Sequence, residues 1–158
     1  MLDISPCHTL RINKNFSGGM LLFEIHSIPR PQKQTRWSKQ GAYDPSKQYK
    51  DTLRWQIMPH APQEPLQGPV SVHITFYMPI PKETSNFRRQ RMLNGLIHHV
   101  VRPDIDNLAY IVINAMKELI YDDDKQVVDL ILSKRYGEVP RTVIKVCQID
   151  VASNYTHT

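Results

Sequence analysis

The sequence predicts an α+β fold in which two to three helices pack on a small mixed β-sheet of about four strands. Stretches rich in β-branched and aromatic residues lie near both ends of the chain and in its middle. Segments with apolar residues at helical spacing lie between these stretches. This mixture of elements is typical of helices packed against a sheet. No internal repeat is visible, and no apolar run approaches the roughly 20 residues that a membrane-spanning helix needs.

The first half of the chain predicts one strand, one long loop and one helix. Residues 20–28, MLLFEIHSI, have the composition of a strand. Residues 29–45 contain three prolines, one glycine and almost no apolar periodicity, so they predict a long basic loop. Helical spacing follows over residues 46–60, with Ser46 at the N-cap position and Pro59 at the end of the helix.

The second half predicts three strands and two helices. Apolar and polar residues alternate over residues 70–78, which indicates a half-buried strand. A short helix is expected over residues 83–93, and a longer one over residues 106–120 with a wide apolar stripe. The β-rich segments 124–137 and 141–151 are separated by the turn GEVP, so we expect them to pair antiparallel.

The length of 158 residues fits one domain, which we place at residues 20–151. Residues 1–19 form an N-terminal extension before it, and residues 152–158 form a polar tail. The N-terminus lacks the basic start and long apolar stretch of a secretory signal. Cys7 and Cys147 do not have the spacing of metal ligands. We therefore expect a cytoplasmic protein with no membrane partner.

Charge is arranged in blocks along the chain. Residues 29–55 carry seven basic and two acidic side chains, and residues 82–102 carry five basic and one acidic. Residues 103–124 reverse this balance with six acidic side chains and one basic. A single basic stretch is more often a solvated loop than a binding site. Two basic blocks before an acidic one, however, suit a polyanion that must meet a metal.

The acidic block opens with the residues RPDIDN. Pro103 disfavours a helical backbone at Arg102, and in extended chain residues two apart point the same way. We therefore expect Asp104 and Asp106 to present their carboxylates on one side while Ile105 turns toward the core. An aspartate before a helix is also a favoured cap that complements the helix dipole, and this explanation is the commoner one for an isolated pair.

Three more aspartates follow the predicted helix, in the stretch YDDDK over residues 121–125. Mg²⁺ prefers oxygen ligands, and one or two usually come from carboxylates of the protein. A helix of about 15 residues is about 22 Å long, so its two ends cannot reach one ion. A third ligand must come from a partner subunit, or from a chain that doubles back after a shorter helix. The clustering makes a metal site about as well supported as a solvated turn.

RPDIDNL, the apolar helix and YDDDKQVVDLILSKRYG together resemble the RusA family of endodeoxyribonucleases, the Holliday-junction resolvases of bacteria and their phages. The family pattern is a basic residue, then D-x-D-N-L, a helix, D-D-x-Q-V/I-V and a basic strand. Residues 102–137 match it in both spacing and residue type. The stretches IPRPQKQTRW and GPVSVHITFYMPIPK extend the resemblance over most of residues 20–150. It implies a RusA-like fold and an origin in a phage or prophage.

The resemblance also implies a homodimer that nicks branched double-stranded DNA symmetrically at four-way junctions, in recombination and repair. The implied cofactor is Mg²⁺, with Mn²⁺ as an alternative. The catalytic metal-site acids fall on Asp104, Asp106 and Asp124, and Asp123 is a further metal ligand. Many family members have a lysine four residues after the second aspartate, where this chain has Tyr110. Candidates for the missing cation are Lys125, Lys134, Arg102 and His99.

The departure at Tyr110 leaves a second interpretation open. A phenol carries no positive charge at neutral pH, because its pKa is near 10. The alternative is therefore a junction-DNA-binding protein with the same fold and weak or no cleavage.

The expected DNA-binding residues lie in the basic blocks and in the last basic strand. Trp37 either stacks on bases exposed at the junction or covers the sheet, and the two interpretations have similar weight. Adjacent residues of His98-His99 point apart, so one of them is expected in the core. The full expected DNA-binding set is Arg30, Lys33, Arg36, Trp37, Lys39, Arg88, Arg89, Arg102 and Lys134.

Overall fold

The computed structural model describes residues 19–149, so the expected tail and nearly all of the expected N-terminal extension lie outside the described residues. Within the described residues, nine main elements follow one another: β1 (Met20–Ile25), β2 (Arg36–Ser38), β3 (Gly41–Tyr43), α1 (Lys47–Ile57), β4 (Val70–Pro79), α2 (Asn86–Leu93), α3 (Ile105–Met116), β5 (Val127–Gly137) and β6 (Arg141–Gln148). Single 3₁₀ turns follow α1, at Met58–His60, and precede β5, at Asp124–Gln126.

A mixed sheet of four strands is the centre of the fold, with the order β1-β6-β4-β5. β4 runs parallel to β5 and antiparallel to β6, and β6 runs antiparallel to β1. The α+β class and the four-stranded mixed sheet are thus confirmed. The expected pairing of β5 with β6 is wrong, because β4 lies between them. Their short connection has only to cross about 10 Å, two strand spacings, which a few extended residues can span.

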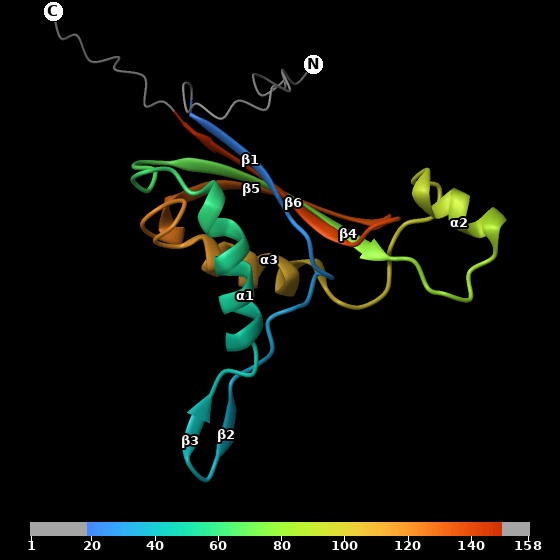
Figure 1. Cartoon of the computed structure of the whole chain (residues 1–158), viewed down its shortest axis with the longest axis horizontal. Coiled ribbons are helices and arrows are strands. Elements are labelled where there is room, and N and C mark those ends of the chain that lie inside the picture. Colours follow the sequence, from blue (N-terminus) through green and yellow to red (C-terminus); the bar gives the residue numbers. More distant parts are fainter. Residues whose placement is uncertain (1–18, 150–158) are drawn as a thin grey trace, which may run out of the picture.

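The core lies between the sheet and the helices α1 and α3, which cover the same face of the sheet (Figure 1). β4 alternates as its sequence predicted, with one face buried and the other half-buried. The helices contribute their apolar stripes to the same core. The buried residues that these three elements contribute are Val70, Val72, Ile74, Phe76 and Met78 of β4, Leu53 and Ile57 of α1, and Leu108, Ala109, Ile111, Val112, Ala115 and Met116 of α3.

Helix α3 is shorter than expected, because it ends at Met116 rather than at residue 120. The last carbonyls of a helix lack partners within the helix. Here the Nη1 atom of Arg54, on α1, donates hydrogen bonds to the carbonyls of Ala115 (3.2 Å) and Lys117 (2.7 Å). Glu118 then adopts a left-handed backbone with φ of 64°. The chain therefore turns sharply before the second group of aspartates.

Two segments project from this body (Figure 1). Residues 29–45 were expected as a loop, but they contain the hairpin β2–β3, in which Trp37 pairs with Ala42. We call this hairpin, residues 36–43, the arm. The second projection carries α2 at the far end of the sheet. No helix among residues 19–149 has the length and apolar character needed to cross a membrane.

Candidate active site and nucleic-acid interface

The first acid pair stands at the start of α3. Asp104 is the N-cap residue with an extended backbone, and Asp106 lies in the first helical turn. Both side chains are exposed, while Ile105 between them is half-buried and packs against the core. The backbone was expected to be extended from Asp104 to Asp106. It is extended only at Asp104, because the helix already begins at Ile105. The Asp104 side chain makes no capping hydrogen bond, so capping does not occupy its oxygens.

The backbone before this pair is fixed by Lys134 of β5. Its Nζ atom donates hydrogen bonds of 2.8 Å to the carbonyls of Val101 and Pro103, on either side of Arg102. The Arg102–Pro103 peptide bond is cis. Lys134 was expected as a DNA contact, and within the protein it donates two of its three ammonium protons to these carbonyls. Its position makes it a support for the loop that ends in Asp104.

The second acid group follows the turn after α3, and each of its three members has a partner within the protein. The carboxylate of Asp122 accepts a hydrogen bond of 2.7 Å from Nε2 of Gln67. Asp123 caps the 3₁₀ turn and accepts from the backbone N–H of Lys125 at 3.0 Å. Gln126 closes the capping box by accepting from the backbone N–H of Asp123. This hydrogen bonding holds the start of β5 in a defined position.

Lys117 is the cation of the second acid group. Its Nζ atom lies 3.2 Å from Oδ1 of Asp124 and 3.4 Å from Oδ2 of Asp123. The hydrogen bond to Asp124 is the main cause that raises the pKa of Lys117. The pKa of Asp123 is lowered, first by the N–H of Lys125, then by Asp124 and Lys117. Asp123 is therefore held as a carboxylate next to the positive charge of Lys117.

Within the chain the two acid groups lie toward opposite ends of α3, whose 12 residues span about 18 Å. The chain does double back after a shorter helix, but it brings Asp123 and Asp124 to Lys117 rather than to Asp104. Among residues 19–149, no three His, Cys, Asp or Glu side chains lie close enough together to hold a metal ion. The donor set of carboxylate oxygens suits Mg²⁺. Within the described residues, however, these carboxylates lie in two separate groups, one at each end of α3.

One face of α3 connects these two parts. Asp106, Tyr110 and Asn114 follow one another at a spacing of four residues, which places them on the same side of a helix. Tyr110 is 58% exposed there. The Asn114 side chain donates a 2.9 Å hydrogen bond to the carbonyl of Tyr110 and so lies along the helix. Lys117 continues this face at the helix end.

The sequence profile described as Endodeoxyribonuclease RusA matches residues 27–147, which include both acid groups, the arm and the whole face of α3. The chain belongs to the RusA endodeoxyribonuclease family. A protein of Bacillus subtilis (strain 168) that carries the name Uncharacterized protein YqaN is 36% identical over 135 residues. That alignment covers 80% of this chain and 95% of the relative.

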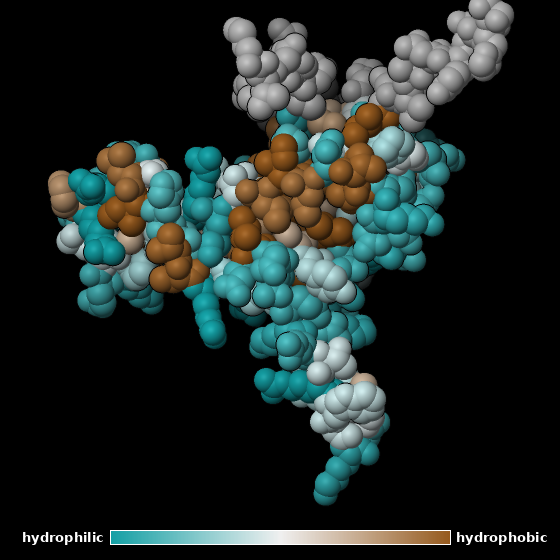
Figure 2. All heavy atoms as spheres, turned by 180° about the vertical axis from the view of Figure 1, so that it is seen from behind, coloured by the Kyte–Doolittle hydropathy of each residue, from teal (hydrophilic) through white to brown (hydrophobic). Residues whose placement is uncertain are grey.

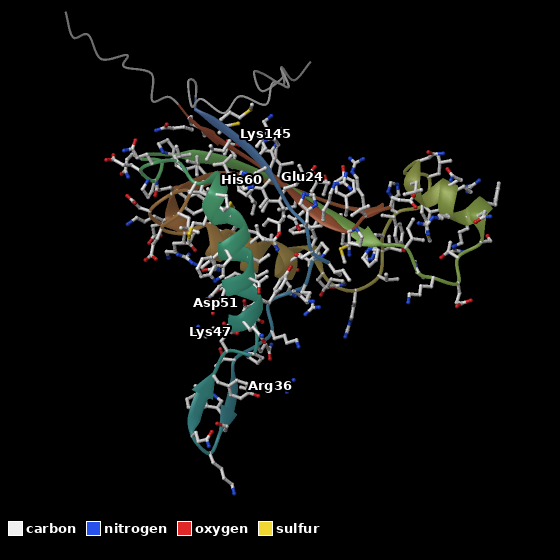
Figure 3. All side chains as sticks on the ribbon, in the orientation of Figure 1. Glu24, Arg36, Lys47, Asp51, His60 and Lys145 are labelled. Atoms are coloured by element: carbon white, nitrogen blue, oxygen red, sulfur yellow. The ribbon has the colours of Figure 1, made fainter. Side chains whose placement is uncertain are left out.

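In this member of the RusA family, the arm carries three exposed residues that were expected to bind DNA. Arg36 lies on the arm, well away from the sheet (Figure 3). Trp37 is 83% exposed, so it does not cover the sheet. Lys39 lies in the turn between the two strands of the arm. Arg30 and Lys33 are exposed at the base of the arm.

The second basic block of this RusA-family chain is partly engaged with the protein itself. Arg89 on α2 forms an ion pair of 2.6 Å with Glu138. Arg88 on the same helix is exposed, as is Arg102 before the acid pair. The expectation of one core histidine agrees with His99, which is only 8% exposed.

Sequence reasoning missed two contacts of the site. Lys117 was counted in the charge of the acidic block, as the one basic residue between positions 103 and 124, but was not among the candidates for the missing cation. The backbone N–H of Gln32 donates a 3.0 Å hydrogen bond to the carbonyl of Asn107, which ties the basic segment before the arm to the first turn of α3. No local pattern in the sequence signals this second contact.

Proposed function

We propose that this protein is a divalent-metal-dependent endonuclease that resolves four-way DNA junctions by paired nicks as a homodimer. The observation that carries the proposal is the placement of two acid groups at the two ends of the exposed face of α3, in a chain of the RusA family. The metal in this proposal is Mg²⁺, with Mn²⁺ as an alternative. The protein acts in the cytoplasm during recombination and repair of phage or prophage DNA.

A second copy of the chain is needed because one protomer separates its acids. In a twofold dimer, the start of α3 in one subunit can meet the far end of α3 in the other, so that both sites are completed together. The apolar surface on the back of the molecule supports such a contact (Figure 2). β5 is an edge strand of the sheet, and its exposed apolar residues are Val128, Leu130 and Ile131. An apolar edge strand is a ready surface for a partner chain.

Asp104, Asp106 and Asp124 would hold the metal, with Asp123 beside them. A bound divalent ion activates water and stabilises charge that develops on a phosphate. Lys117 contributes a positive charge at the position where Asp124 would meet the phosphate, and thereby offsets the absence of a cation at Tyr110. The exposed cations of the arm and of α2 hold backbone phosphates, which fixes the position of the DNA but reads no sequence.

A second candidate function is junction binding with weak or no cleavage. The observation in its favour is Tyr110, which is exposed in the middle of the α3 face and carries no charge at neutral pH. In this case the fold, the arm and the dimer are retained, and the acids do not support turnover at a useful rate.

One assay separates the two functions. A synthetic four-way junction and a linear duplex are incubated with the protein, with and without Mg²⁺. Wild type is compared with Asp104→Asn and with the control Asp122→Asn, whose side chain is held by Gln67. Nicking of the junction that requires metal, is lost in Asp104→Asn and persists in Asp122→Asn supports the nuclease. Tight junction binding without nicks supports the second function. Absence of junction binding contradicts both.

A further inference from the structure

A cavity of about 480 Å³ opens at the base of the arm, between the segment after β1 and the first turns of α1. Two cations line it, Arg30 and Lys33, and no acidic side chain is among its lining residues. Hydroxyl groups from both walls complete the lining: those of Ser27, Ser46, Tyr49 and Thr52. The cavity is therefore polar and positively charged.

Hydrogen bonds between side-chain hydroxyls of one wall and the backbone of the other wall hold the cavity together. The hydroxyl of Tyr49 donates to the carbonyl of Ile28 at 3.3 Å and accepts from the backbone N–H of Arg30 at 3.2 Å. The hydroxyl of Ser46 accepts from the backbone N–H of Lys33 at 2.7 Å. These contacts fix the path of the segment and leave the guanidinium and ammonium groups available to a ligand. The guanidinium of Arg30 lies over the Tyr49 ring, 5.7 Å from its centre.

Two further features favour an anionic ligand. Ser46 is the N-cap residue of α1, yet its side chain caps nothing, because its hydroxyl is used by Lys33. The first turn of α1 also contains no acid, and the carboxylate of Asp44, just before the helix, accepts only the backbone N–H of Ser46, at 2.8 Å, at this helix end. Independently, the Ser27 hydroxyl is buried and has no hydrogen-bond partner among the described residues. A buried hydroxyl without a partner is costly, and a ligand oxygen would satisfy it.

The cavity lies next to the candidate active site. Pro31 lines the cavity, and the neighbouring Gln32 donates its backbone N–H to the carbonyl of Asn107. Asn107 directly follows Asp106 in the first turn of α3. The same short segment thus forms a wall of the cavity and touches the helix start that carries the acid pair. A DNA strand that passes from these acids toward the arm meets the cavity on its way.

We propose that this cavity binds the phosphate and sugar of one nucleotide of the DNA strand, adjacent to the phosphodiester that is cut. The volume exceeds what a lone phosphate ion fills and lies in the usual range of small-ligand pockets. The proposal rests on the proposed nuclease function for the identity of the strand. The chemistry of the ligand follows from the cavity itself.

A double-mutant cycle on DNA tests the proposal. Junctions with one neutral methylphosphonate at successive positions around the cut are bound to wild type, to Lys33→Gln and to the control Lys82→Gln, which removes an exposed lysine outside the cavity. At one position the neutral linkage should weaken binding of wild type and Lys82→Gln by on the order of tenfold, and leave Lys33→Gln nearly unaffected. Equal losses for Lys33→Gln and wild type at every position overturn the proposal.

A second experiment separates failure of the cavity from failure of the proposed function. Thymidine 3′,5′-bisphosphate is titrated into the full chain without DNA, and amide signals are followed by NMR. Signals of Ser27, Lys33 and Thr52 should shift, and the Ser27→Ala variant should bind several-fold more weakly while unfolding no more easily in urea. Shifts confined to other regions, or unchanged affinity in Ser27→Ala, overturn the proposal even if the protein cuts junctions. A chain that cuts no junction yet gives these shifts loses the nuclease function only.

Discussion

The ammonium of Lys117 lies 3.2 Å from Oδ1 of Asp124, so the second acid group carries its own counter-ion. The contact exists because α3 stops at Met116 and Glu118 turns the chain back. A carboxylate already paired with a lysine is less attractive to a metal ion than a free one. The same lysine also brings a positive charge to the place where a phosphate would arrive.

Lys117→Gln is therefore expected to have two opposite effects. The Mg²⁺ concentration that gives half-maximal nicking should fall, because the carboxylates of Asp123 and Asp124 lose their competing cation. The maximal rate should fall by about tenfold or more, because charge on the phosphate loses a partner. Metal titration of the nicking rate measures both quantities. A variant with an unchanged rate and an unchanged metal requirement would show that Lys117 has no part in the site.

Lys134→Met tests whether Lys134 supports the loop before Asp104 or contacts DNA. Loss of the two 2.8 Å hydrogen bonds to the carbonyls of Val101 and Pro103 should lower kcat by roughly tenfold, because Asp104 is no longer held in place. Junction affinity and its dependence on salt should change little. A direct phosphate contact predicts the reverse, with a salt slope reduced by about 1. Arg135→Met, at the exposed neighbouring position of β5, is the control for charge loss.

Trp37→Ala tests the arm. Stacking of a base on an aromatic side chain contributes about 1–3 kcal/mol, so junction affinity should fall at least about fivefold. The free energy of unfolding should not change, because Trp37 is 83% exposed. Trp55→Ala is the matched control, since Trp55 is 71% exposed on α1 and outside the arm. Equal junction affinity of the two variants, measured by fluorescence anisotropy, would exclude stacking by Trp37.

The elements that sequence reasoning found correctly are those that depend on local pattern. The strict alternation of β4 predicted its buried face and its bounds to within one residue, and the apolar stripe of α3 predicted the face that enters the core. The strand pairing failed because β4 and β5 come together across a long stretch of chain, and a short turn between β5 and β6 carries no information about a third strand. A local hairpin signal cannot distinguish these two arrangements.

The candidate site shows the same division. The motif predicts Asp104, Asp106 and Asp124 as site residues, but their separation along α3 depends on where the helix ends. At that end, the carbonyls of Ala115 and Lys117 accept hydrogen bonds from Arg54, which lies 61 residues from Ala115 in the sequence and belongs to no local helix-stop pattern. The pairing of Lys117 with Asp124 depends on where α3 ends, so it could not be predicted from the sequence either. Contacts between distant segments, rather than motifs, decide how the acids are arranged.

Stability should decrease at mildly acidic pH because of His99. Burial is the main cause that lowers the pKa of His99, and nearby Lys134 adds to the effect. In the unfolded chain the pKa returns to about 6.5, so the unfolded state takes up a proton first as the pH falls. The stability contribution of neutral His99 is thus complete above about pH 6.5 and declines below it, until the folded protein is protonated too.

Urea unfolding at pH 7.5 and pH 5.5 measures this decline, and His99→Phe should reduce it. Phenylalanine retains a ring that can pack against Tyr136, whose ring centre lies 4.8 Å from that of His99. The variant should also be no less stable at pH 7.5, because it removes the buried Nδ1 atom that lacks a partner among the described residues. His73, whose pKa is also lowered by burial, accounts for the residual slope. An identical pH slope in wild type and His99→Phe would contradict this assignment.

Tyr110→Lys asks whether the uncharged residue in the middle of the α3 face limits the rate. The side chain is 58% exposed and one helical turn beyond Asp106, so a lysine fits there without disturbing the core. An ammonium at this point adds a positive charge beside a phosphate held at the acid pair, and the nicking rate should rise by tenfold or more. Tyr110→Gln, which places a flexible but uncharged polar side chain at this position, is the control and should leave the rate near that of wild type. If Lys117 already supplies the whole of the needed charge, Tyr110→Lys gives no gain in the wild-type background but restores the rate lost in Lys117→Gln. Failure to accelerate either background would mean that positive charge on this face does not limit the reaction.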